Sequence, residues 1–298
     1  MTTKPVLRSA LGVLAVATAT HGTGRDDDIP LPRLPGFVES AFSPLAYEVS
    51  RRCLTERPDD AGSRSSEAGS GTGERTAVAL ASLTGDTTTA DLASRRMVSG
   101  KVHNPLLFMQ ATPNSVLGHI SREFGITGQM FSVSTLADPV TELLTLADLL
   151  LEEPELDRVL VLGVELGGGE RLAAVHRELA ADSGRPVPEL PASAGYAAAV
   201  LLGRPGAGAP VTVRSAETAH GPGHDPLDSG ALRHRGSLQS LFELAEAHRR
   251  LLREGGSHLL VTEPAEGSSA DAFTLTACAD ASAQAATGRN EKRTHAHQ

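Results

Sequence analysis

Apolar residues follow two spacings along the chain, one typical of β-strands and one of α-helices. Short apolar runs of strand length lie at residues 11–19, 76–83, 130–135, 158–164, 198–202, 211–213, 258–262 and 273–276. Between them, apolar residues recur at helical spacing over residues 43–54, 141–153 and 237–253. Strands that alternate with helices predict an α/β fold built on a layered sheet.

Three of these segments predict their place in the fold. Ser43 followed by Pro44 is typical of a helix start. The leucines of residues 141–153 cover nearly the whole helical circumference, which predicts a helix buried in the middle of the fold. Residues 158–164 form a continuous apolar run, as in a central strand covered on both faces.

Two segments lack the apolar residues that a core requires. Residues 56–74 are rich in Ser, Gly, Asp and Arg, and residues 281–298 have a similar polar character. We expect a single domain over residues 1–280 that carries a mobile loop at 56–74, followed by a disordered tail at 281–298.

Charge and cysteine content narrow the classes of function. The chain of 298 residues has a net charge of -9, which disfavours nucleic acid or an anionic membrane as a partner. An acidic carrier protein stays possible if a local basic patch receives it. Cys53 and Cys278 are the only cysteines and lack CxxC spacing, which excludes a zinc knuckle and gives no sign of a disulfide framework. We also expect no bound metal and no cofactor.

The start of the chain allows two interpretations. Lys4 and Arg8 precede the apolar run at 11–19, an order that also occurs in secretory signals. The run is short and weakly apolar, and it fits a first buried strand equally well. No stretch reaches transmembrane length. We therefore expect a strand here and a reducing, cytoplasmic location for the protein.

Residues 104–137 carry the most specific signal. They read NPLLFMQATPNSVLGHISREFGITGQMFSVSTLA. This segment resembles the one that leads to the nucleophile of β-ketoacyl synthases, and the places of that family's pattern are kept without a gap by Asn114, Gly118, Phe124, Gly125 and Gly128. The resemblance implies a thiolase-like layered αβαβα fold, here with a shortened C-terminal half.

The nucleophile of that family is absent. In the family, a Cys lies in a turn between a strand and a buried helix, whose N-terminus lowers the thiol pKa and stabilises an oxyanion. At this position the chain has Ala137, and a methyl group cannot attack a thioester. Asp138 and Pro139 then form a good N-cap and first-turn pair, so the resemblance implies a turn with a structural role only.

The two catalytic histidines of the family also lack counterparts. The HGTG motif at residues 21–24 lies in the wrong half of the chain. His220 and His224 have a metal-like spacing but no evident third ligand, and a polar Gly/Pro loop explains them as well. The second half of the chain is compressed, and the family's histidine motif is missing from it.

A degenerate ketosynthase of this kind resembles the chain length factor of type II polyketide synthases, and the shortened half is similar to truncated partners in synthases of reduced polyenes. The resemblance implies a heterodimer with an active ketosynthase, and a tunnel for the chain that grows on an acyl carrier protein. One departure is that many chain length factors have Gln where this chain has Ala137.

The resemblance also implies residue roles. Leu107 matches a bulky residue that reaches across the dimer interface into the partner's acyl pocket, although ordinary core is an equal interpretation. A strand in this segment would continue the sheet across the dimer. The tunnel and interface residues are Leu106, Leu107, Phe108, Met109, Thr88 and Leu92, and the dimer strand contains Phe131, Val133 and Thr135.

Two other functions remain open from the sequence. One is a stand-alone decarboxylase or hydrolase that uses Ser132, Ser134 or His220 in a remodelled pocket, which requires a base within hydrogen-bond reach. The other is a homodimeric pseudoenzyme that binds an acyl ligand. Turnover by the purified chain would favour the first, and its oligomeric state beside a ketosynthase separates the second from a partner subunit.

Overall fold

A computed structural model describes residues 5–55, 73–100, 106–134, 139–183, 193–206, 208–216, 236–262 and 271–278. The strands are β1 (Leu11–His21), β2 (Thr76–Ala81), β3 (Met130–Val133), β4 (Arg158–Leu166), β5 (Gly195–Gly203), β6 (Val211–Ser215), β7 (Ser257–Val261) and β8 (Ala272–Ala277). The helices are α1 (Phe42–Thr55), α2 (Thr87–Val98), α3 (Leu106–Gln110), α4 (Pro113–Phe124), α5 (Pro139–Leu150), α6 (Glu170–Ser183) and α7 (Gln239–Glu254), preceded by the 3₁₀ turn η2 (Gly236–Leu238). The predicted loop, up to residue 72, and the predicted tail lie outside the described residues.

The strands form one mixed sheet in the order β3-β2-β4-β5-β1-β6-β8-β7. β2 runs parallel to β3 and β4, and the other neighbours pair antiparallel. β1 pairs with β5 along its length but with β6 only over Leu11–Val13, next to a register shift between Val13 and Ala15. Such a bulge bends a strand. The sheet thus has a larger part, β3 to β1, and a smaller part of β6, β8 and β7.

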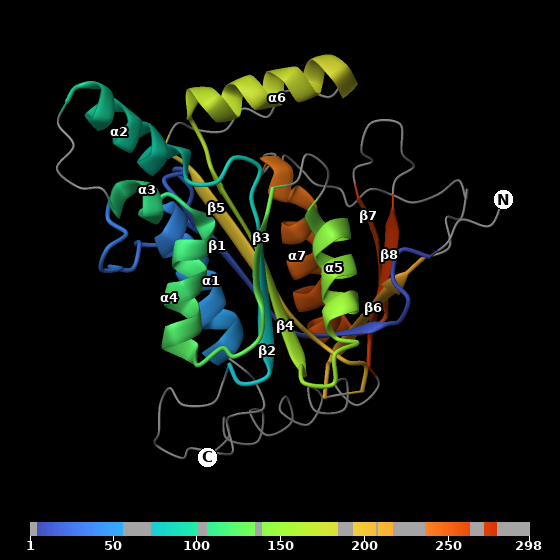
Figure 1. Cartoon of the computed structure of the whole chain (residues 1–298). Coiled ribbons are helices and arrows are strands. Elements are labelled where there is room, and N and C mark those ends of the chain that lie inside the picture. The colour runs from blue at the N-terminus through green and yellow to red at the C-terminus, as the bar shows by residue number, and fades with distance from the viewer. Residues whose placement is uncertain are drawn as a thin grey trace, which may run out of the picture.

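Helices cover both faces of the larger part. α1 and α4 pack on one face, where Leu45 and Ile120 share a core with Leu160 of β4. α5 and α7 pack on the other face and lie between the larger and smaller parts of the sheet (Figure 1). Their core joins Val161 of β4 to Phe273 of β8. The order of layers is therefore helix, sheet, helix, sheet.

Buried apolar and partly exposed polar residues alternate along β8 in the smaller part of the sheet. Phe273 and Leu275 of β8 are buried, whereas the alternate residues Thr274 and Thr276 are partly exposed. This alternation is typical of a sheet with one apolar face and one hydrated face. The described residues thus show four of the five layers of the expected αβαβα arrangement, which agrees with a shortened C-terminal half.

The central helix α5 is less buried than its sequence predicts. Leu149 is 50% exposed, so one side of the helix faces solvent rather than a further layer. The buried Asp148 accepts hydrogen bonds from the Arg8 backbone N–H and the Ser9 hydroxyl, each at 2.7 Å. The expectation of a helix buried all round is therefore wrong, since Glu142, Thr145 and Leu149 are exposed on one side of α5.

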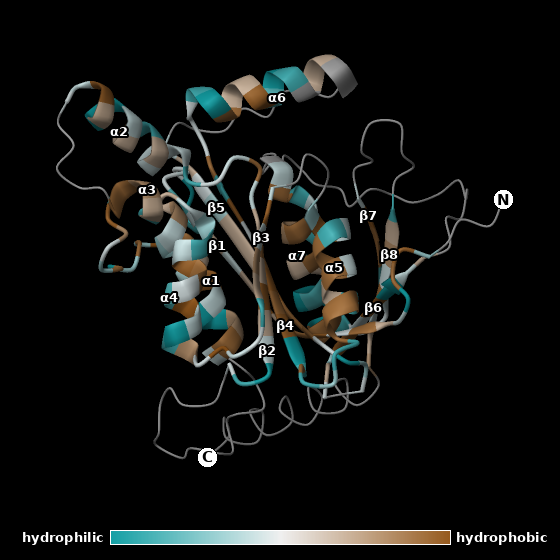
Figure 2. Ribbon diagram, in the orientation of Figure 1, coloured by the Kyte–Doolittle hydropathy of each residue, from teal (hydrophilic) through white to brown (hydrophobic). Residues whose placement is uncertain are grey.

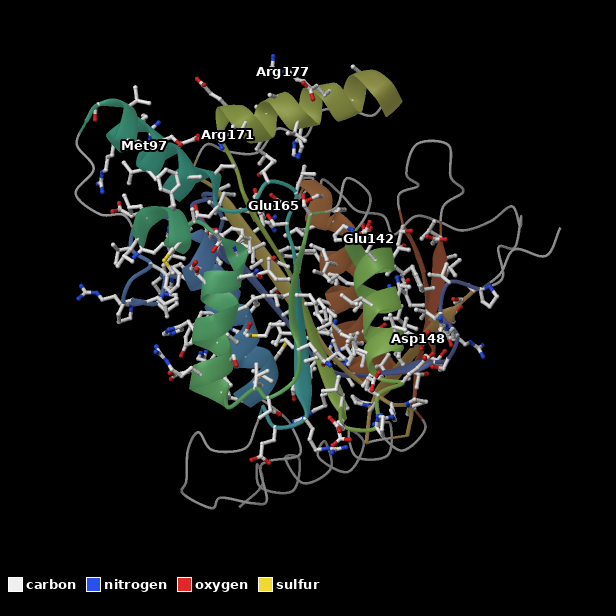
Figure 3. All side chains as sticks on the ribbon, viewed as in Figure 1. Met97, Glu142, Asp148, Glu165, Arg171 and Arg177 are labelled. Carbon is white, nitrogen blue, oxygen red and sulfur yellow. The ribbon has the colours of Figure 1, made fainter. Side chains whose placement is uncertain are left out.

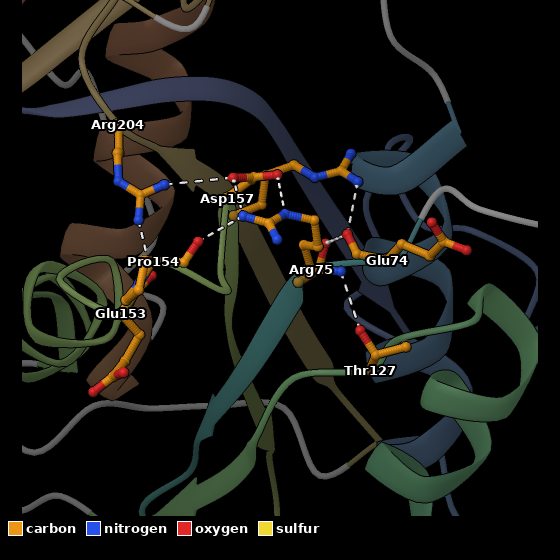
Figure 4. A network of polar contacts seen from close by, with 9 residues as sticks. Glu74, Arg75, Thr127, Glu153, Pro154, Asp157 and Arg204 are labelled. Atoms are coloured by element: carbon orange, nitrogen blue, oxygen red, sulfur yellow. Dashed lines mark hydrogen bonds and ion pairs between the residues drawn. The ribbon is translucent and has the colours of Figure 1, made fainter.

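A polar network lies at the amino ends of β2 and β4 (Figure 4). Asp157 accepts from the Nε of Arg75 at 2.6 Å, and Arg204 approaches the same carboxylate at 3.4 Å. Arg75 has a φ of 54°, a left-handed conformation that is uncommon for a residue other than glycine. These side chains are about half exposed, so the network adds little stability and serves mainly to join three strand ends.

The apolar run near the start of the chain forms strand β1, which confirms the strand interpretation. Among the described residues, none of the helices is both long enough and apolar enough to cross a membrane.

Candidate functional site

The carboxyl ends of the parallel strands β2, β3 and β4 lie at the same end of the sheet, where helix α5 begins. β3 ends at Val133 and α5 starts at Pro139. The predicted strand before Ala137 and the predicted helix after it are therefore present. Ala137 itself, with Thr135 and Asp138, lies outside the described residues.

A buried carboxyl group lies at the carboxyl ends of these strands. Glu165 is 1% exposed at the end of β4, below α6 (Figure 3). Its Oε1 accepts hydrogen bonds from the backbone N–H of Leu83 and from the hydroxyls of Ser82 and Ser237, both at 3.3 Å. Oε2 has no hydrogen-bond partner among the described residues. Burial raises the pKa of Glu165 to about 7, although the hydrogen bonds oppose this shift.

Among the described residues, no base contacts the serines at the end of β3. The hydroxyl of Ser134 donates to the backbone carbonyl of Leu83 at 2.9 Å, and Ser132 is exposed. A nucleophilic serine needs an acceptor such as histidine within hydrogen-bond reach. The described contacts give Ser134 a structural role, and His220, His224 and their loop lie outside the described residues.

A second buried carboxyl group caps helix α2, which begins near the same strand ends. Asp86 caps the helix by accepting from the Thr89 backbone N–H at 3.0 Å, and it also accepts from the Ser40 hydroxyl at 2.6 Å. Burial raises the pKa of Asp86. On this helix, Thr88 is exposed and Leu92 is half-buried, so both predicted tunnel residues lie on one anchored element.

Helix α3 divides the predicted interface residues into two groups. Leu107 is only 2% exposed, so its side chain lies in this chain's own core. Its neighbours Leu106, Phe108 and Met109 are 54%, 42% and 63% exposed. In the isolated chain, Leu107 is therefore part of the core. Its neighbours Leu106, Phe108 and Met109 are the residues exposed on the surface.

These exposed residues form part of an apolar surface. α3 contacts α2, whose last residues Met97 and Val98 are 51% and 89% exposed. Figure 2 shows apolar colour on both segments, and Figure 3 labels Met97 at the far end of α2. We call this surface the α2–α3 patch, and its members are Met97, Val98, Leu106, Phe108 and Met109.

Strand β3 lies at the edge of the sheet. Within the described residues it pairs with β2 alone, in register from Met130 to Val133. Met130 is 43% exposed, and Phe131 and Val133 are half-buried. A short strand of this kind leaves N–H and C=O groups free to pair with another chain.

The HGTG motif forms a turn rather than a catalytic site. Asp28 accepts from the Thr23 backbone N–H at 2.8 Å, the Thr23 hydroxyl at 2.6 Å and the Gly24 N–H at 2.9 Å. The Nδ1 of His21 contacts the carbonyl of Ile29 at 2.9 Å. In the part of the chain that the structure describes, no group of three or more metal-ligating side chains occurs.

Sequence reasoning missed Glu165, the most unusual residue at the carboxyl ends of the parallel strands. The signal was a single acidic residue inside the apolar run that forms β4. A charged residue at the end of a buried strand is uncommon, and in this fold it marks the place where a core strand reaches a polar cluster.

Comparison with solved structures identifies the fold. The complex of the ketosynthase ApeO with its chain length factor ApeC from Xenorhabdus doucetiae matches with a TM-score of 0.53 and 15% identity, over 90% of this chain and 100% of that chain. The ishigamide ketosynthase/chain length factor matches with a TM-score of 0.55 and 14% identity, over 82% of this chain and 83% of that chain.

A third structure is AntDE:AntF, a type II polyketide synthase acyl-carrier protein in complex with its ketosynthase bound to the hexaketide. It matches with a TM-score of 0.53 and 11% identity, over 92% of this chain and 100% of that chain. No protein-family model and no curated protein matches the sequence.

At this low identity, the likeness establishes the fold. The chain has the thiolase-like α/β fold seen in structures of ketosynthases with chain length factors, which confirms the fold predicted from the sequence.

Proposed function

We propose that the chain is a non-catalytic chain length factor of type II polyketide biosynthesis. It pairs with an active β-ketoacyl synthase and shapes the tunnel in which the acyl or polyene chain grows on its acyl carrier protein. The observation that carries this proposal is that residues 104–137, which resemble the ketosynthase segment, include both the exposed helix α3 and the edge strand β3. The fold shared with ketosynthase/chain length factor complexes supports it.

The α2–α3 patch supports a partner of apolar character. Its side chains are exposed on two helices that contact each other, and exposed apolar residues of this kind are candidates for an interaction site. Helix α4 links this patch to β3, since it contacts both α3 and β3.

The absence of a nucleophile supports a passive role. The residue at the family's nucleophile position is Ala137, and the described serines beside it donate to backbone or face solvent. Apolar walls would favour a growing chain by about 0.8 kcal/mol per buried CH₂ until a bulky side chain stops it. Phe108 and Met109 are the exposed bulky residues best suited to enter the partner's pocket.

Coexpression with a Cys-containing ketosynthase of similar fold tests the proposal. Native mass spectrometry should show a one-to-one heterodimer, and Phe108→Glu should weaken it by at least roughly 100-fold because a carboxylate would be buried in an apolar interface. Val261→Glu is the matched control, since Val261 is 48% exposed on β7 at the opposite end of the sheet. Equal binding by both variants, or a homodimer that excludes the ketosynthase, would contradict the proposal.

A further inference from the structure

A polar cavity of about 260 Å³ lies on the side of β1 that β6 leaves unpaired. Strand β1 lines it with Thr18 and Thr20, α1 with Arg52, and α7 with Glu246 and Arg249. Asp27 lines it from the loop that follows β1. Its lining residues include neither Glu165 and its hydrogen-bond partners nor any member of the α2–α3 patch.

Arg249 is the unusual residue of this cavity. Its side chain is half-buried, and its Nη2 donates to the Thr18 hydroxyl oxygen at 2.8 Å. No carboxylate lies within 4.0 Å of its guanidinium among the described residues, and burial lowers its pKa. Most of its N–H donors therefore have no protein acceptor there. A half-buried cation without a counter-ion is costly, and an anion beside it would offset that cost.

The other charged residues of the cavity are either paired or exposed to solvent. Arg52 pairs with Glu48 at 2.8 Å and donates to the backbone carbonyl of Thr18 at 3.2 Å. Asp27 pairs with Arg25 at 3.0 Å. Glu246 is exposed, so its charge is hydrated and compensates Arg249 only weakly. The uncompensated charge inside the cavity is positive.

We propose that this cavity binds a small oxyanion, a carboxylate or a phosphate, held by the guanidinium of Arg249 and the hydroxyl of Thr18. The planar fork of arginine fits two oxygens of either group. The Thr18 oxygen accepts from Arg249, so its O–H proton is available to the ligand. At about 30 Å³ per water molecule, the volume suits phosphate or a short dicarboxylate rather than a long acyl chain.

Titration of the full chain at constant ionic strength tests this site. Sodium phosphate and sodium malonate are the two probes, sodium chloride is the control, and the Arg249 side-chain Nε–H signal in ¹⁵N NMR is the readout. A saturable shift with phosphate, malonate or both supports the site and identifies the preferred class of anion. Absence of a saturable shift with either probe overturns it, and this result does not depend on any variant.

Four variants then assign the donors. Arg249→Gln should raise the dissociation constant at least about tenfold and Thr18→Val severalfold, because each removes a donor. Glu246→Gln should lower it, because a neighbouring negative charge is removed. The matched control is Arg253→Gln, an exposed arginine on the same helix with the same change of charge. If Arg253→Gln weakens binding as much as Arg249→Gln, the effect is general electrostatics and the site is refuted.

Discussion

Two buried titratable residues have opposite effects on how stability depends on pH. Burial raises the pKa of Glu165 to about 7 from 4.5, and it lowers the pKa of His248 to about 4 from 6.5. For His248, an interaction with the backbone of Val13 opposes this shift without cancelling it. Both side chains are therefore held preferentially in their neutral forms.

The signs of the two contributions follow from proton binding. Between about pH 4.5 and 7, folded Glu165 holds a proton that the unfolded chain releases, so its contribution to stability falls as pH rises. Between about pH 4 and 6.5, unfolded His248 binds a proton that the folded chain excludes, so its contribution rises with pH. In the natural chain these slopes oppose each other over the shared range.

In the variant Glu165→Gln, only the contribution of His248 to the pH dependence of the free energy of unfolding should remain. We expect the free energy of unfolding of this variant to rise with pH from about 4 to 6.5, whereas His248→Leu should leave a free energy that falls from about pH 4.5 to 7. Each slope should amount to at most a few kcal/mol over its range. Urea unfolding across pH 4 to 8 measures both, and parallel profiles for the natural chain and the variants would show that neither group titrates in this way.

Leu107 and Leu106 provide a matched pair of residues on one short helix. Leu107→Ala should lower the free energy of unfolding by about 2–5 kcal/mol because it leaves a cavity in a core, whereas Leu106→Ala should change it little because the side chain is 54% exposed. Chemical denaturation of both variants compares them. Equal stability of the two would contradict the core placement, and a changed product length in that case would favour the tunnel role for Leu107.

Residue roles were only partly predictable from the sequence. The resemblance singled out the segment that contains Leu107, but adjacent apolar residues on a short helix differ in burial by their rotation about its axis. Sequence spacing over five residues does not fix that rotation. Glu165 was missed for a related reason, because a strand's apolar pattern does not reveal which loop hydroxyls and N–H groups meet its end.

Elements with a long apolar pattern were predicted well, and shorter amphipathic ones were not. The strands at 158–164 and 198–202 and the helix at 237–253 appear in the structure with small changes of boundary. Helix α4 was not predicted, although Pro113 at its start and Gly125 in a left-handed conformation at its end are typical helix signals. Helix α6 also went unpredicted.

The cap of helix α2 provides a test at the level of an element. Asp86→Ala should destabilise the protein by about 1–3 kcal/mol, because it removes the N-cap and leaves the Ser40 and Thr89 donors without their acceptor. Asp86→Asn is the conservative control, since its amide oxygen can still accept from the Thr89 N–H. Thermal unfolding of both variants decides, and an equal loss in the two would indicate that the charge rather than the cap matters.

At the scale of the whole molecule, most of the exposed large apolar residues on helices α2 and α3 and on strand β3 lie toward one end of the strand order. Strand β7, with the exposed Val261, lies at the other end. The compressed second half of the chain was visible in the sequence. The separation of the sheet into two parts coincides with a register shift in β1, which no local sequence pattern predicts.

The most direct test of the proposed function is to find which subunit carries the acyl group. The copurified heterodimer is incubated with radiolabelled malonyl and acyl-loaded carrier protein, its subunits are separated, and each is examined by intact mass. If this chain is a partner subunit, the acyl group should be attached only to the ketosynthase cysteine, and this chain should keep its unmodified mass, both alone and in the complex. Acylation of this chain, or condensation of malonyl units by this chain in isolation, would contradict its role as a non-catalytic subunit.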